Sequence, residues 1–208
     1  IKIMIKKLFD IVTVVILFPI FLPLLIIIAF VLSINQGLPV FFIQDRVGKD
    51  SKNFKLYKFR TMEITAEEDF HKSHYLDLAK GKIIEPNNYP LEPIRIENDD
   101  RITSLGALLR KTSLDELPNI FNVLKGDMSL VGPRPLVDYE SELYGKFNSK
   151  RNSVLPGITG LAQIQGRLDL SLQERLYWDL QYIENYSFTE DLKIIFKTVF
   201  SVLSKKGA

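Results

Sequence analysis

An apolar segment near the N-terminus constrains this chain more than any other feature of its sequence. No charged residue occurs from Ile11 to Gln44, and the 22 residues Ile11–Leu32 are apolar apart from one threonine and two prolines, Pro19 and Pro23. As one straight helix this segment is about 33 Å long, which is enough to cross the hydrocarbon core of a bilayer. A cleaved signal peptide is a poor match, because the run is too long and no small-residue cleavage site follows. A soluble core helix is also a poor match, because a helix that is apolar all round needs an unusually large core.

The flanks and the prolines leave two topologies open for this segment. Lysines precede it at positions 2, 6 and 7, and six bases against one acid follow between Arg46 and Arg60. Because cytoplasmic flanks prefer Lys and Arg, two basic flanks favour a re-entrant helix with both ends on one side. Pro23 supplies a break, since a proline inside a helix removes a backbone hydrogen bond and kinks it. Prolines also occur in spanning helices, so these residues alone do not separate a re-entrant helix from a spanning one.

Charge and cysteine content narrow the classes of function. The net charge is +2, but residues 63–98 carry eight acids and four bases, so an acidic insert sits in a basic remainder. A basic body suits anionic partners such as phosphates or a lipid surface. The chain has no cysteine, which excludes disulfides, thiolate zinc sites, iron–sulfur clusters and cysteine nucleophiles.

The rest of the sequence predicts an α+β fold that is mostly helical with a small sheet. Pro39–Ile43 and Phe54–Phe59 read as the strands of a hairpin, and Pro156–Gly160 reads as a turn. Helices are expected to end at Lys111 and to cover 138–148, 171–186 and 191–205; the last is amphipathic and fits either a membrane surface or the domain core. We therefore expect a membrane-anchoring helix at 1–38 and a catalytic domain at 39–208 that includes the 63–98 insert.

Two adjacent carboxylates, Asp115 and Glu116, stand where a helix is predicted to begin. Ser113 and Glu116 have the spacing of a capping box, and Pro118 fits the first turn of a helix that stops at Gly126. The positive end of that helix would favour the ionised form of Asp115, as a nucleophile or a metal ligand requires. Taken alone, these residues fit a helix cap and a solvated acid better than a site.

Cationic and amide side chains in the surrounding motifs favour a functional site over a simple helix cap. Arg134 lies in the stiff loop Gly132–Pro135, where two prolines fix the backbone and its guanidinium suits phosphate oxygens. The other candidate substrate-binding residues are Lys58, Arg60, Arg110, Gln163 and Arg167. Cations around a carboxylate pair are what phosphoryl transfer needs, namely charge neutralisation, a metal ligand and a nucleophile. The usual glycine-rich nucleotide motifs do not occur, so a nucleotide would be held in another way.

Five short motifs follow one another along the chain: Lys58–Met62, Thr112–Pro118, Asn122–Ser129, Val131–Pro135 and Pro156–Gly160. In this order they resemble the bacterial sugar transferase family, the monotopic phosphoglycosyl transferases, over essentially the whole chain. The chain is similar to the small members that consist of the catalytic core, although residues 63–98 are longer than expected for the smallest of them.

The resemblance implies an activity at the cytoplasmic face of the bacterial inner membrane. Members of the family move a sugar phosphate from a UDP-sugar to a polyprenol phosphate such as undecaprenyl phosphate and release UMP. The aspartate that matches Asp115 attacks the β-phosphate and forms a covalent phosphosugar ester, with Mg²⁺ bound at this aspartate. The residue that matches Glu116 assists, and the one that matches Arg134 contacts phosphate. Two steps would also let a soluble donor and a lipid acceptor use one small site in turn.

The resemblance also implies a re-entrant helix broken at a Ser-Pro pair. Here the pair is Leu22-Pro23, so the proline is kept and the serine is not. Two other functions remain open: direct transfer in a ternary complex with Asp115 only a metal ligand, and a non-catalytic membrane scaffold, which the intact dyad and Arg134 disfavour. The sugar is not specified, although residues 163–168 and the 63–98 insert are candidate selectors, and a homo-oligomer stays open.

Overall fold

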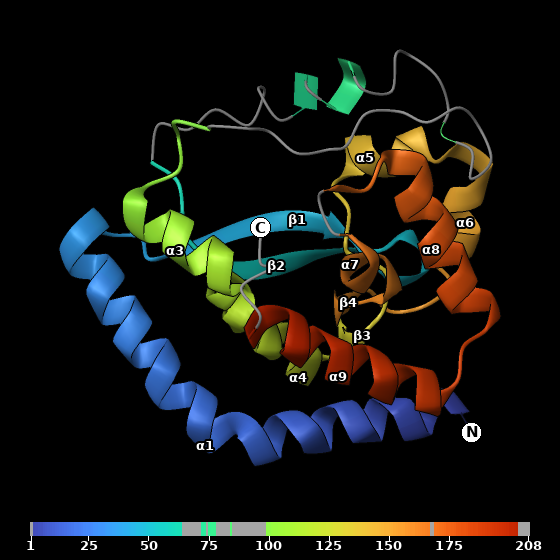
Figure 1. Cartoon of the computed structure of the whole chain (residues 1–208), viewed down its shortest axis with the longest axis horizontal. Helices are drawn as coiled ribbons and strands as arrows, with labels where there is room; N and C mark the ends of the chain where they lie inside the picture. The colour runs from blue at the N-terminus through green and yellow to red at the C-terminus, as the bar shows by residue number, and fades with distance from the viewer. Residues whose placement is uncertain are drawn as a thin grey trace.

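The computed structural model describes residues 2–63, 72–73, 75–77, 84, 99–166 and 169–203, and it confirms the α+β class with helices dominant (Figure 1). Most of the predicted acidic insert lies outside these residues. The longer elements are α1 (Lys2–Gln36), β1 (Phe41–Val47), β2 (Asn53–Phe59), α3 (Ser104–Thr112), α8 (Leu172–Glu184) and α9 (Phe188–Leu203). The shorter ones are α4 (Ile120–Lys125), β3 (Ser129–Val131), α5 (Asp138–Leu143), α6 (Asn148–Arg151), β4 (Gly157–Thr159) and α7 (Leu161–Gln165), with 3₁₀ turns η1 (Lys49–Ser51), η2 (Leu114–Asn119) and η3 (Gly145–Phe147).

The predicted hairpin is confirmed, and its strands extend further towards the turn than expected. β1 and β2 pair antiparallel in a register that runs from Phe41 opposite Phe59 to Val47 opposite Asn53. Leu56 and Phe59 of β2 are almost fully buried, in a cluster that also takes side chains from α1, α3 and α4. The 3₁₀ turn η2 and helix α4 therefore pack against the hairpin.

A second, parallel sheet was not predicted, and the expected turn at Pro156–Gly160 contains one of its strands. Ser129 of β3 pairs with Gly157 of β4, and the backbone N–H of Gly132 donates to Thr159 at 2.8 Å. A Cβ atom added to Gly157 would lie 2.1 Å from the backbone nitrogen of Gly132, so only glycine lets the two segments approach this closely. This contact places the loop after β3 against the segment Pro156–Gly160.

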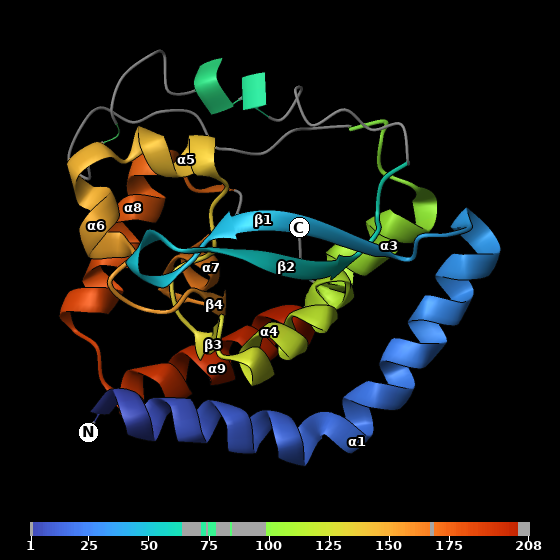
Figure 2. The same ribbon diagram turned by 180° about the vertical axis from the view of Figure 1, so that it is seen from behind.

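Helix α1 is long and apolar enough to cross a membrane by length and composition. It contains Pro19 and Pro23 near its middle, and the helix bends there into two arms, as Figures 1 and 2 both show. Proline is an established cause of such bends, because its ring clashes with the preceding turn and it donates no hydrogen bond. Many apolar side chains on both arms are exposed, among them Met4, Ile16 and Ile27.

Both ends of α1 contact the same folded body. On the first arm, Lys6 Nζ lies 2.6 Å from Asp191 Oδ2 of α9, and the hydroxyl of Ser129 in β3 donates to Asp10 at 2.6 Å. At the far end, Arg60 donates to the carbonyl oxygens of Gln36 and, at 3.0 Å, Gly37. The bend is what allows both ends to reach one domain.

Helix α9 lies beside the first arm of α1, with the rings of Phe9 and Phe188 4.9 Å apart. Its inner residue Ile194 is fully buried in a cluster with Val131 and Tyr182, whereas Phe196 and Phe200 stay about two-thirds exposed. This amphipathic helix was expected to lie either on the core or on a membrane surface. Its inner face packs on the core, and its exposed outer face remains available to a membrane surface.

Candidate active site

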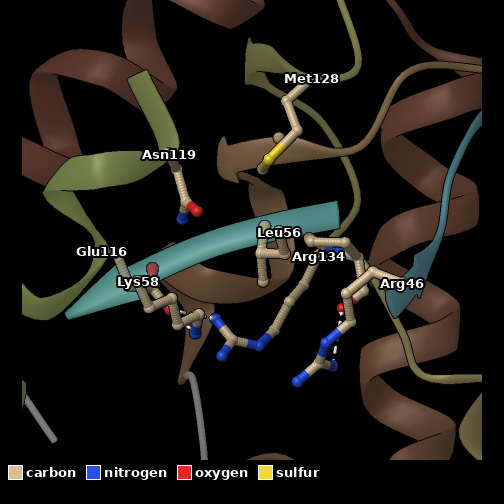
Figure 3. A pocket seen from close by; sticks show the side chains of 9 residues that line it. Arg46, Leu56, Lys58, Glu116, Asn119, Met128 and Arg134 are labelled. Atoms are coloured by element: carbon tan, nitrogen blue, oxygen red, sulfur yellow. Dashed lines mark hydrogen bonds and ion pairs between the residues drawn. The ribbon is translucent and has the colours of Figure 1, made fainter. Parts of the chain in front are cut away.

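Glu116 lies at the centre of a cluster that joins three predicted site residues. Its Oε1 accepts from Lys58 Nζ at 2.8 Å and from Arg134 Nη1 at 2.9 Å (Figure 3). The three side chains are only 15% (Lys58), 19% (Glu116) and 33% (Arg134) exposed, so the ion pairs are shielded from bulk water. Residues 58, 116 and 134 come from β2, η2 and the loop after β3, and the fold brings them together.

The dyad sits on η2, which packs along β2. Ser113 ends α3 in the left-handed conformation, with φ of 57°, and its N–H donates to Arg110. The predicted capping box is therefore wrong: the Ser113 side chain makes no cap bond, and Glu116 turns towards Lys58 and Arg134 instead. The helix predicted after Pro118 is confirmed as α4, which ends at Gly126 with φ of 83°.

The two carboxylates of the dyad have opposite electrostatic environments. Burial alone would raise the pKa of Glu116, but Lys58 and Arg134 outweigh it and hold that pKa far below its usual range. Burial, together with the charge of Glu116, raises the pKa of Asp115 to about 6. The helix end was expected to favour ionised Asp115, but the pKa is raised, because burial and then the like charge of Glu116 disfavour the ionised form.

The pKa values of Lys58 and Arg134 are also shifted, by burial and by the charge of Glu116. Burial lowers the pKa of Lys58, which Glu116 opposes, and the charge of Glu116 raises the pKa of Arg134. Both remain cationic partners of Glu116, since each donates a hydrogen bond to the same oxygen.

Asp115 is the unpaired member of the dyad. Among the described residues, no ion pair or hydrogen bond engages its carboxylate. Arg110 is close enough to interact with it electrostatically, and its Nε donates to the hydroxyl of Thr61 at 2.8 Å. The oxygens of Asp115 are therefore available to a phosphorus atom or a metal ion.

The donor set fits a magnesium ion held jointly with a substrate. In the part of the chain that the structure describes, no three acidic or histidine side chains gather as a metal-binding group. Mg²⁺ commonly binds one or two carboxylates and completes its shell with water and substrate phosphates. The unpaired Asp115 carboxylate meets that requirement, and a closed protein cage is not needed.

The other predicted site residues are placed differently. Arg60 lies outside the cluster, because β2 ends at Phe59 and the guanidinium turns to the end of α1. Gln163 lies in α7 with both amide atoms enclosed and unpaired within the described structure. Arg167 lies outside the described residues. Pro23, the predicted membrane break, lies inside α1.

A small pocket beside the cluster adds residues that the sequence did not single out. Besides Lys58, Glu116 and Arg134, it is lined by Arg46, Leu56, Asn119, Met128, Pro135 and Gly157. Asn119 is 2% exposed, and its side-chain oxygen has no partner among the described residues. The proximity of Asn119 to Asp115 and Glu116 along η2 is the one sequence signal that pointed to it.

Comparison with known proteins gives consistent matches over the whole chain. A family described as bacterial sugar transferase matches residues 1–205. The chain is 39% identical over 204 residues to a UDP-galactose-lipid carrier transferase of Erwinia amylovora, covering 98% of this chain and 41% of that protein. It is 39% identical over 211 residues to a UDP-glucose:undecaprenyl-phosphate glucose-1-phosphate transferase of Klebsiella pneumoniae, with 98% and 41% covered. It is 38% identical over 207 residues to the exopolysaccharide production protein ExoY of Rhizobium meliloti, with 99% and 88% covered. The chain thus spans about two fifths of the first two relatives and most of the third.

Proposed function

This chain belongs to the bacterial sugar transferase family, and on that premise we propose that it transfers a sugar phosphate from a UDP-sugar to undecaprenyl phosphate or a related polyprenol phosphate. The observation that carries the proposal is the asymmetry of the dyad: Glu116 holds two cations, while Asp115 is left unpaired. The names of the relatives include both UDP-galactose and UDP-glucose, so the sugar stays open.

The first step is attack by an Asp115 carboxylate oxygen on the β-phosphorus of the donor. A bond forms between that oxygen and phosphorus, the bond from phosphorus to the bridging oxygen breaks, and UMP leaves with the electron pair. The sugar phosphate is then esterified to Asp115. An unpaired carboxylate with a pKa of about 6 is ionised at neutral pH and is not neutralised by a protein cation, as a nucleophile requires.

The second step returns the carboxylate. A phosphate oxygen of the polyprenol phosphate attacks the same phosphorus, the acyl phosphate bond breaks, and a polyprenyl diphosphate sugar is released. Lys58 and Arg134 are positioned to stabilise negative charge on the phosphoryl oxygens, because Glu116 fixes both cations beside Asp115. A magnesium ion, when bound at Asp115 with the diphosphate, would supply further charge neutralisation.

The chain is further proposed to be monotopic, with α1 entering and leaving one leaflet from the cytoplasmic side. Lys6 and Asp10 of the first arm, and Gln36 at the other end, all contact one domain. A helix that crossed the bilayer would place its ends on opposite faces, so contacts at both ends support re-entry. A UDP-sugar donor is cytoplasmic, which sets the side.

The covalent route is tested by omitting the acceptor. The chain in detergent is incubated with a panel of UDP-sugars and Mg²⁺, and intact-mass spectrometry and UMP release are measured. One productive donor should give a mass increase of one sugar phosphate and about one equivalent of UMP, and Asp115→Asn should give neither. UMP that appears only after undecaprenyl phosphate is added, with no adduct, would instead establish direct transfer. No turnover with any donor, with or without acceptor, would contradict the proposed enzyme class.

A further inference from the structure

The loop that carries Arg134 is held through its carbonyl oxygens. Pro133 and Pro135 have no N–H groups, so this loop offers few donors with which to fix itself to neighbouring backbone. Backbone N–H groups hold the two sides of the loop: Gly157 donates to the carbonyl of Pro133 at 2.9 Å, and Val47 donates to that of Leu136 at 2.7 Å. Two arginines bind the carbonyls between them: Arg151 Nη2 donates to that of Arg134 at 2.6 Å, and Arg46 Nη1 donates to that of Pro135 at 3.2 Å. At Arg134 and Pro135, the backbone is therefore placed by side chains from other elements.

Arg151 is itself fixed on its other side. Its Nε and Nη2 both lie 2.8 Å from Asp179 Oδ2 of α8, and the two side chains are only 2% and 1% exposed. The guanidinium also lies 5.5 Å from the centre of the Tyr144 ring. A planar fork held by a carboxylate and a ring face has little freedom, so the Nη2 group that binds the Arg134 carbonyl points in a defined direction.

A buried ion pair of this kind is weak evidence for stability, because desolvation of both charges offsets their attraction. Its geometric consequence is clear, however. The carbonyl that Arg151 binds belongs to Arg134, the residue whose guanidinium meets Glu116 at 2.9 Å. Fixing that carbonyl fixes the origin of the Arg134 side chain.

We propose that Arg151, oriented by Asp179, is a positioning residue that sets the place of the Arg134 guanidinium beside the Asp115–Glu116 dyad. The proposal rests on the function proposed above for that site. Arg151 itself does not touch the dyad; it acts on chemistry through the backbone of Arg134. A loop released from this contact lets the guanidinium move away from Glu116, and displacements of about 1 Å in an active site can cost about 10²-fold in rate.

The test removes the pair without leaving a buried charge. The double substitution Arg151→Met with Asp179→Leu replaces both ions by apolar groups of similar length, which such buried pairs often tolerate. Arg151→Lys is the second variant, since it keeps the ion pair and loses the planar fork. The matched control is Lys150→Met, because Lys150 is the neighbour of Arg151 on α6 and its pair with Glu184 is half exposed.

Two measurements are made on each variant. With a productive UDP-sugar, we expect kcat for the Met/Leu variant to fall about 10- to 100-fold with KM changed less than about threefold, since the misplaced guanidinium serves the charge that develops in the transition state. Arg151→Lys should recover part of this loss, and Lys150→Met should match the parent. In an Arg134→Ala background the Met/Leu substitution should change kcat less than about threefold, because the group it positions is gone. An equal loss in both backgrounds, or no loss in either, would overturn the inference.

Hydrogen exchange of the peptide that spans Val131–Leu136 gives a readout without substrate. Faster exchange is expected in the Met/Leu variant, confined to this peptide, and unchanged exchange is expected in Lys150→Met. Unchanged exchange in the Met/Leu variant would refute the positioning role even if no UDP-sugar proved to be a substrate. Failure of turnover by the parent would instead contradict the proposed function alone.

Discussion

Replacing Asp115 by asparagine is expected to stabilise the fold at neutral pH while it abolishes the covalent adduct. The pKa of Asp115 is raised from 3.8 to about 6, mainly by burial and then by Glu116. At about 1.4 kcal/mol per pKa unit, the ionised carboxylate costs about 3 kcal/mol, which we discount to about 2 kcal/mol because the side chain is partly exposed. Asparagine keeps the shape and carries no charge, so this cost disappears. For a chain of this size the gain corresponds to a rise in Tm of about 4–8 °C.

The pH dependence follows from the direction of the shift. Because the folded-state pKa lies above the unfolded one, the native protein binds more protons than the unfolded chain between about pH 4 and pH 6. The stability of the parent therefore falls as pH rises through this window and stays reduced above it. The difference in Tm between Asp115→Asn and the parent should be near zero below pH 4 and fully developed above pH 6.

Thermal melting followed by the fluorescence of Trp178, the one tryptophan of the chain, measures this difference. The buffer contains a chelator, because a divalent cation at Asp115 would offset its charge. Glu116→Gln is the control of opposite sign. Its parent carboxylate has a lowered pKa and contributes stability above its unfolded value of 4.5 that is lost on acidification, so this variant should melt below the parent at neutral pH. Asp115→Asn that melts at or below the parent at pH 7.5, or a gain that persists at pH 3.5, would refute the reasoning.

Four further outcomes are expected. Arg134→Lys should lower kcat/KM for adduct formation about 10- to 100-fold, since a point charge cannot reproduce a planar fork; parent-like kinetics would remove Arg134 from the site. A chelator should stop adduct formation and Mg²⁺ should restore it, because two carboxylates face a diphosphate; full activity of metal-free protein would contradict this. A single cysteine in place of Met4, in a chain without native Cys, should resist an impermeant periplasmic thiol reagent in intact cells and react after lysis, whereas strong periplasmic labelling would contradict re-entry. Replacing Pro19 and Pro23 by leucine should bias α1 towards spanning and increase that labelling, since both backbone hydrogen bonds become available.

Local patterns predicted much of this fold. Alternating apolar residues in 54–59 identified β2, and the sequence from Pro118 to Gly126 identified α4 with its left-handed glycine end. The motifs also predicted that Lys58, Glu116 and Arg134 belong to one site, although their sequence separations gave no distances. The amphipathic pattern near the C-terminus identified α9 but did not decide between packing on the core and lying on a membrane surface, and the fold shows one buried face and one exposed apolar face.

The errors arose where tertiary contacts decide a side chain's direction. Arg60 was expected to bind substrate together with Lys58, but β2 ends at Phe59, and Arg60 binds the carbonyls at the end of α1. Ser113 matched a capping box, but its left-handed backbone belongs to the end of α3. The glycine-rich stretch at 156–160 looked like a turn because its partner, β3, is 25 residues away in sequence and only the fold brings them together.

The same distinction explains why the ionisation of Asp115 could not be read from its position at a helix start. A helix dipole contributes less than burial of a charge, and burial is a property of the assembled site. The arrangement gives the neighbouring acid its role: Lys58 and Arg134 repel each other, and the pKa of Lys58 is lowered further by that repulsion after burial has lowered it. Glu116 offsets the repulsion by accepting from both cations through one oxygen, and it therefore stays ionised while it adds to the cost of ionising Asp115. In the function that we propose, one carboxylate assembles the cations, and the other is left without a protein partner to meet an electrophile that brings its own negative charge.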